Sequence, residues 1–183
     1  RTDADQISAM TEGLAAKLKD DPNNAEGWAM LARSYAVLSR FPDALPAYQK
    51  AIALRPDDAQ LYADYADALA VTKGRTLAGE PAELVAKALS LDPENFKALS
   101  LSGTMAFEKQ DFKAAASLWE RALKNGPPDN PELVKQIQSA LDDARQRVGL
   151  SPLAAVVSPV TSPAQPVAVG ASGSGEGVLV AAV

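Results

Sequence analysis

Three pairs of neighbouring aspartates are the side chains that could perform acid–base chemistry: Asp20 with Asp21, Asp57 with Asp58, and Asp142 with Asp143. The sequence contains no His and no Cys, which excludes a Ser–His–Asp triad, a thiolate nucleophile and a usual zinc site. Carboxylate-only catalysis is the enzymatic alternative that remains. However, the pairs fall at expected helix ends or on a polar helix face, where aspartate caps a helix or is solvated. We therefore predict a protein that is not an enzyme and holds no cofactor or metal.

Methionines and glycines offer two further kinds of site. Met10, Met30 and Met105 could ligate haem iron, but their spacing is typical of helix packing, so we interpret them as core residues. Gly74 and Gly79 lack the spacing and the Lys-Ser/Thr step of a phosphate-binding loop. The formal net charge is −5 and no stretch is basic, which argues against a nucleic-acid partner.

Prolines recur at a nearly constant interval along the first two thirds of the chain. Pro22, Pro56, Pro93 and Pro127 are separated by 34, 37 and 34 residues. A period of 34 is typical of tetratricopeptide (TPR) repeats, which are pairs of antiparallel helices, and the longer middle interval indicates a three-residue insertion. The residues of the first unit that match the TPR pattern are Trp28, Leu31, Ala32, Tyr35, Ala44, Tyr48, Ala51 and Pro56.

The residue types of this pattern have a physical logic. Small residues let the two helices approach closely, large rings fill the space between them, and the proline ends the second helix. The third unit matches at Leu99, Gly103, Ala106, Ala115, Trp119, Ala122 and Pro127. The second unit is looser, because Pro81 and Val85 replace the expected small and aromatic residues. A longer turn over 71–80 contains its two glycines.

These patterns predict an all-α fold, a TPR helical solenoid with capping helices and a Pro/Gly-rich tail. We expect a TPR domain over 1–148, with a half-repeat helix over 4–19, repeats at about 25–58, 59–95 and 96–129, and a capping helix over 131–148. Residues 149–177 have linker composition. The apolar residues 178–183 are expected to begin the strand of a truncated β domain, or to dock on the repeats.

In a TPR stack the first helix of each pair lines the concave face, and fixed positions of each repeat point into it. Counting these positions predicts a peptide-binding groove lined by Glu26, Ala29, Arg33, Val37, Gln60, Ala63, Asp67, Lys97, Ser100, Thr104 and Phe107. Small residues leave room for a guest helix or extended peptide, and mixed charges favour specific pairing. Arg33 could instead simply pair with Glu26 or Asp67. Phe107 is either an exposed anchor or partly covered by the capping helix.

The sequence closely resembles the TPR domain of the bacterial cytochrome c-type biogenesis proteins, the CcmI/CycH/NrfG group. Residues 21–35 (DPNNAEGWAMLARSY) resemble the start of that domain, and 61–70 (LYADYADALA) resemble its second repeat. The turn that ends in Leu77-Ala78-Gly79-Glu80-Pro81 is the most specific feature, because generic TPRs lack this insertion. Residues 91–99 (LDPENFKAL) continue a resemblance that covers about 5–148.

This resemblance implies a periplasmic, protein-binding chaperone module behind an inner-membrane anchor. Members hold the C-terminal segment of an apocytochrome c and present its haem-binding cysteines to the thioreduction and haem-ligation proteins of the maturation system. Longer members carry a β-rich domain after the repeats, so the tail favours the CcmI/CycH type. No signal peptide or membrane span is visible. We therefore expect the fragment itself to be soluble, and an upstream anchor to have been removed from it.

A second hypothesis comes from the repeats alone. A general TPR scaffold that bridges subunits of an envelope complex would show the same helix pairs and the same groove. An apocytochrome peptide that binds the groove would favour the maturation hypothesis, and partners unrelated to cytochrome maturation would favour the scaffold.

Overall fold

The computed structural model describes residues 2–125 and 129–150, and this part of the chain is helical throughout apart from short turns. Its helices are α1 (Asp3–Asp20), α2 (Ala25–Val37), α3 (Phe41–Leu54), α4 (Ala59–Thr72), α5 (Glu80–Leu91), α6 (Phe96–Glu108), α7 (Phe112–Lys124) and α8 (Pro131–Arg147). The predicted all-α TPR solenoid is therefore confirmed. The predicted end of the third repeat, at 126–128, and the predicted linker and β segment, at 151–183, lie outside the described residues.

Helix starts and ends follow directly from the sequence. Side chains of Asn24, Asp58, Asn95, Asp111 and Asn130 each accept a hydrogen bond from the backbone N–H three residues on, which satisfies a donor that the first turn leaves free. Three helices, α1, α3 and α5, each end two residues before a repeat-marking proline, because proline restricts the residue that precedes it. These boundary residues set the lengths of the helices.

One turn geometry closes the first helix of every repeat. The backbone N–H groups of Arg40, Arg75 and Asp111 each donate to the carbonyl five residues earlier, at 2.8, 2.7 and 2.9 Å. The residue before each donor has a positive φ of 57–75°, as a Schellman turn requires. Only the middle turn uses glycine, Gly74, whereas Ser39 and Gln110 take the left-handed conformation in the other two.

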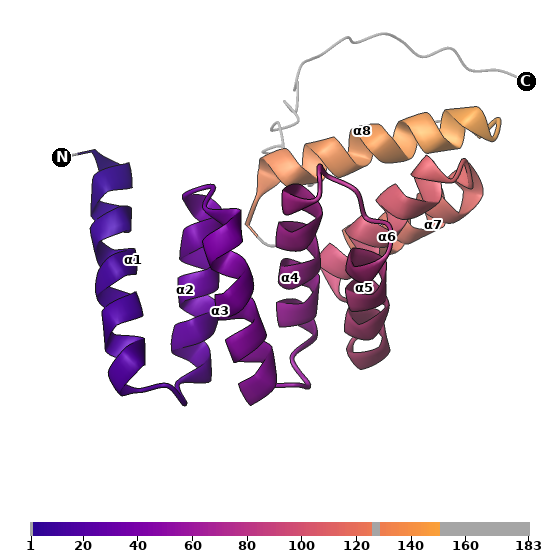
Figure 1. Ribbon diagram of the computed structural model, residues 1–183. Coiled ribbons are helices and arrows are strands. Elements are labelled where there is room, and N and C mark those ends of the chain that lie inside the picture. The colour runs from indigo at the N-terminus through magenta and orange to yellow at the C-terminus, as the bar shows by residue number, and fades with distance from the viewer. Residues whose placement is uncertain (1, 126–128, 151–183) are drawn as a thin grey trace, which may run out of the picture. The chain divides into compact units, whose positions relative to one another are not determined.

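The helices pack pairwise, and Figure 1 shows α1 to α7 side by side in chain order. The pairs α2–α3, α4–α5 and α6–α7 are the TPR units, while α8 packs on α7 and runs across the neighbouring pairs. Alanines without exposed surface, such as Ala32, Ala44 and Ala51, sit where two helices meet, so the backbones approach closely.

Met10 and Met30 are exposed, so the prediction that they are core residues is wrong. Their spacing is that of a helix face, but the face on which each lies points towards solvent.

Candidate protein-binding groove

A cavity of about 810 Å³ opens on the face formed by the first helices of the three repeats and by α8. Helices α2, α4 and α6 supply Arg33, Ala36, Val37, Gln60, Asp64, Asp67, Phe96, Lys97, Ser100, Leu101 and Thr104. Helix α8 supplies Leu133, Gln136, Ile137 and Ala140, and its N-cap residue Asn130 also lines the cavity. One residue each from α3 and α7, Tyr48 and Trp119, completes the lining. We call this cavity the groove.

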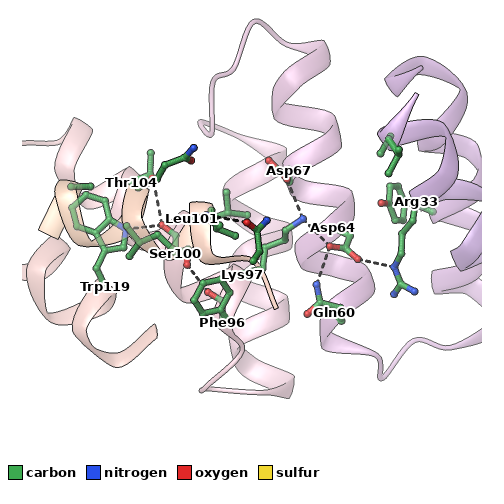
Figure 2. A pocket seen from close by; sticks show the side chains of 18 residues that line it. Arg33, Gln60, Asp64, Asp67, Phe96, Lys97, Ser100, Leu101, Thr104 and Trp119 are labelled. Carbon is green, nitrogen blue, oxygen red and sulfur yellow. Dashed lines mark hydrogen bonds and ion pairs between the residues drawn. The ribbon is translucent and has the colours of Figure 1, made fainter. Parts of the chain in front are cut away.

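The centre of the groove is an ion-pair network built on the carboxylate of Asp64, shown in Figure 2. Lys97 Nζ lies 2.9 Å from Asp64 Oδ1, and Arg33 Nε donates to Oδ2 at 3.2 Å. The side-chain amide of Gln60 donates to Oδ1 at 2.9 Å. The Asp64 side chain is only 8% exposed, so these three donors replace the water that a buried carboxylate loses.

The network extends beyond Asp64 in two directions. Lys97 Nζ also donates to Asp67 Oδ2 at 3.1 Å, so one ammonium joins two carboxylates on successive turns of α4. The amide of buried Asn95 donates to Gln60 Oε1 at 3.1 Å, while its own oxygen caps α6. The groove floor therefore ties α2, α4 and α6 together through side chains whose positions are fixed by hydrogen bonds.

Burial and charge shift two pKa values in this network. Burial alone would lower the pKa of Lys97, but the carboxylates of Asp64 and Asp67 outweigh it and raise that pKa above its ordinary value. Burial, and then the negative charge of Asp64, raises the pKa of the Tyr48 phenol. Lys97 is thus held in its charged form and Tyr48 in its neutral form.

The raised pKa of Tyr48 predicts a measurable pH dependence of the free energy of unfolding. A phenol whose pKa is raised by folding contributes stability that is fully present below the unfolded pKa of about 10 and is lost progressively as pH rises from there to the folded value. We expect the free energy of unfolding of Tyr48→Phe to fall less steeply above pH 10 than that of the unsubstituted chain, whose slope includes about 1.4 kcal/mol per pH unit from this group. Urea unfolding followed by circular dichroism from pH 8 to 11 measures it. Parallel curves for the two proteins would contradict the prediction.

Helix α8 forms an apolar wall of the groove. Leu133, Ile137 and Ala140 recur at helical spacing and line the cavity, while Gln136 lies exposed at its rim. The same helix face continues into the core that α8 shares with Trp119 on α7. The groove therefore has a charged floor and an apolar wall, which suits an amphipathic segment better than a uniformly charged or uniformly apolar one.

Seven of the predicted groove residues line the cavity: Arg33, Val37, Gln60, Asp67, Lys97, Ser100 and Thr104. Ala29 and Ala63 are fully buried, because the positions of the TPR pattern that they occupy lie at helix contacts in this chain. Glu26 pairs with Arg55 at 3.2 Å and is absent from the lining. Ala29 and Ala63 therefore offer no surface to a guest, whereas Glu26 is exposed but lies outside the groove lining.

Phe107 is partly covered, which is one of the two alternatives that the sequence left open for it. Its ring centroid lies 5.1 Å from that of Phe112 and 5.8 Å from that of Trp119, and the guanidinium of Arg147 on α8 lies over it at 5.1 Å. Neither pairing suggested for Arg33 occurs, since Glu26 and Asp67 have other partners. Arg33 pairs with Asp64 instead.

Sequence reasoning missed Asp64 as well as the aromatic residues and the α8 residues of the lining. Asp64 and Asp67 are three residues apart and therefore share one helix face, and this spacing is the signal that could have found Asp64. For α8 the sequence offers no comparable signal, because a capping helix shows its apolar stripe but not the surface that the stripe covers.

No group of three or more Asp or Glu side chains in residues 2–125 and 129–150 is arranged to hold a metal ion. In the same residues, no helix is both long enough and apolar enough to cross a membrane.

Comparisons with known proteins agree with this fold. The family model of the cytochrome c-type biogenesis protein H TPR domain matches residues 1–133. Among solved structures, the crystal structure of the APC/C hetero-tetramer Cut9–Hcn1 superposes with a TM-score of 0.67 over 80% of this chain and 28% of that chain. Its sequence identity is 20%, so this likeness concerns the fold alone.

Two curated relatives support the family relationship at the level of sequence identity. The cytochrome c-type biogenesis protein CycH of Pseudomonas aeruginosa is 31% identical over 142 residues, which cover 78% of this chain and 35% of CycH. The formate-dependent nitrite reductase complex subunit NrfG of Escherichia coli is 30% identical over 134 residues, which cover 72% of this chain and 68% of NrfG. The chain thus spans about a third of CycH and about two thirds of NrfG. With most of its length matched by the family model, the chain belongs to the family of cytochrome c-type biogenesis protein H TPR domains.

Proposed function

We propose that this chain is a protein-binding TPR module of cytochrome c maturation and that its groove holds the C-terminal segment of an apocytochrome c. The observation that carries the proposal is the groove itself, a cavity of about 810 Å³ with a fixed charged floor and an apolar wall. Membership in the biogenesis family supplies the class of guest.

The dimensions and chemistry of the groove suit a peptide segment. Helix-in-groove recognition uses apolar side chains at helical spacing, with polar groups that fix the register. Val37 at one side and Leu133 on α8 at the other can receive apolar side chains, and the network on Asp64 offers charged partners. Because hydrogen bonds already hold that network in place, binding costs little side-chain ordering.

The parent protein, in this proposal, is anchored in the inner membrane with the repeats in the periplasm. There the module keeps the haem-binding cysteines of the apocytochrome accessible to the thioreduction and haem-ligation proteins of the maturation system. The module itself performs no chemistry and binds no nucleic acid. The similarity to CycH, a cytochrome c-type biogenesis protein, and to NrfG, a nitrite reductase complex subunit, supports a role in building cytochromes.

A substitution at the groove rim tests this proposal. Val37 lines the groove and is 71% exposed, so an arginine there can be accommodated by the fold but places a charge where an apolar guest side chain would pack. We expect Val37→Arg to weaken the binding of a C-terminal apocytochrome c helix peptide about tenfold or more, the cost of losing one buried apolar contact and desolvating a charge. Calorimetric titration of the full chain measures the dissociation constant.

Met30 offers the matched control. It lies on the same helix and is also exposed, but it does not line the groove, so Met30→Arg should bind as the unsubstituted chain does. Equal weakening by both substitutions would place the guest elsewhere. Complete absence of binding would favour the alternative, a general TPR scaffold that bridges subunits of an envelope complex, a role that fits the description of NrfG as a complex subunit.

A further inference from the structure

Arg33 uses one of its five N–H donors within residues 2–125 and 129–150. A guanidinium carries five N–H donors, and Arg33 engages Asp64 through Nε alone. Among residues 2–125 and 129–150, no oxygen accepts from its two Nη nitrogens. The side chain is 42% exposed and lines the groove. Asp64 thus fixes the guanidinium by one edge, and its remaining donors are available to a guest.

The second cation of the groove is in a different position. Lys97 Nζ lies between Asp64 at 2.9 Å and Asp67 at 3.1 Å, so two carboxylates surround it. A guest anion that approached Lys97 would meet the charge of Asp67, whose side chain is 47% exposed. Like charges at close range disfavour such a complex. The arrangement therefore directs an anion away from Lys97 and towards Arg33.

The surroundings of Arg33 specify what else the guest carries. Val37 lies four residues further on α2, on the same helix face, and Ala36 also lines the groove. An anion bound to Arg33 therefore has apolar surface beside it. A planar guanidinium with two free nitrogens matches a carboxylate, which can accept two parallel hydrogen bonds.

We infer that Arg33 is the specificity-determining residue of the groove and binds a carboxylate of the guest segment that stands next to an apolar side chain. This inference rests on the proposed function. Asp64 acts as a positioning residue, because it orients the guanidinium without contacting the guest. Asp67 blocks the competing site at Lys97.

Three forms of one peptide test the inference by calorimetry with the full chain. The first is the C-terminal helix peptide of an apocytochrome c as it stands, with its acidic side chains and free terminal carboxylate. The second is amidated at its C-terminus. The third has every Asp and Glu replaced by Asn and Gln. We expect one of the two modified peptides to bind about tenfold to a hundredfold more weakly than the first, the range for losing a hydrogen-bonded charge partner, and that peptide identifies the source of the carboxylate.

Variants of the chain assign the effect to Arg33. Arg33→Gln should bind all three peptides equally and weakly, because it has lost the group that distinguishes them. Arg40→Gln removes a guanidinium that lies outside the groove lining, so this variant should bind each of the three peptides as the unsubstituted chain does. Circular dichroism of each variant confirms that the helices are retained.

The outcomes separate this inference from the proposal beneath it. If the unsubstituted chain binds all three peptides equally well, the proposed function stands and the role of Arg33 is overturned. If Arg33→Gln still discriminates among the peptides, the carboxylate lies elsewhere and the inference is again wrong. If none of the peptides binds, the proposed function fails and the inference fails with it.

Discussion

Replacing Trp119 with alanine is expected to lower the free energy of unfolding by about 3–5 kcal/mol, the usual loss when a buried tryptophan is truncated. Trp119 is 4% exposed, and its indole Nε1 donates to the Ser100 carbonyl at 3.1 Å. It joins α6 and α7 to the α8 core. Because whole domains are stable by only about 5–15 kcal/mol, we expect a marginal fold. Urea unfolding followed by circular dichroism gives the difference.

Trp28 is the matched control for this experiment. Its indole also donates to a backbone carbonyl, that of Pro22 at 2.9 Å, but its ring is only partly buried. We expect a smaller loss from Trp28→Ala, and equal losses from the two substitutions would contradict our account of the α6–α8 core.

Gly103 provides a second check on the same contact. A Cβ built at Gly103 would lie 2.3 Å from Nε1 of Trp119, so Gly103→Ala should destabilise the unsubstituted chain by overpacking. In the Trp119→Ala background the obstruction is gone, and the same change should become neutral or favourable, since alanine is the better helix former. Additive effects of the two substitutions would show that the ring and the glycine do not share this space.

Replacing Asp64 with alanine is expected to lower the free energy of unfolding by about 2–3 kcal/mol. Removing one partner of a buried ion pair costs about 3–5 kcal/mol because the other charge is left uncompensated. We reduce this value because Arg33 and Lys97 are 42% and 33% exposed, so water screens both charges in part. Asp64→Ala also leaves the Gln60 amide without the acceptor it has at 2.9 Å. Chemical unfolding at neutral pH measures the loss.

Asp67→Ala is the control on the same helix. Asp67 pairs only with Lys97 among the residues described here and is 47% exposed, so its removal should cost about 0–1 kcal/mol. If Asp67→Ala and Asp64→Ala destabilise the chain equally, burial of the Asp64 carboxylate does not govern the energetics of the network. We also expect Asp64→Ala to bind the peptide more weakly in a calorimetric titration, because the Arg33 side chain loses the ion pair that orients it.

The repeat architecture could be predicted from the sequence because its signals are local. Prolines at a period near 34 mark helix ends, and small and aromatic residues at fixed positions within one repeat mark the contacts between its two helices. Each such contact joins residues close in the chain, as between Trp119 and Gly103. The Schellman turns were harder to foresee, because Ser39 and Gln110 adopt a positive φ that glycine usually signals.

The groove could be predicted only in part. Positions counted within a repeat placed Arg33, Gln60 and Lys97 correctly on its surface, since the direction of a side chain on a helix follows from its register. The same counting assigned Ala29 to the surface, although a contact with the neighbouring helix buries it. The register of one helix does not determine how tightly the next helix approaches.

The sequence by itself therefore determined the helix pairs, their boundaries, the family and the absence of histidine and cysteine chemistry, because composition and short-range patterns decide these properties. Tertiary structure alone decided that Asp64 is the centre of the ion-pair network and that α8 forms a wall of the groove. Asp64 meets Arg33 from 31 positions earlier and Lys97 from a later repeat. Such contacts depend on the angle and distance at which successive repeats stack, and packing along the whole array sets these quantities.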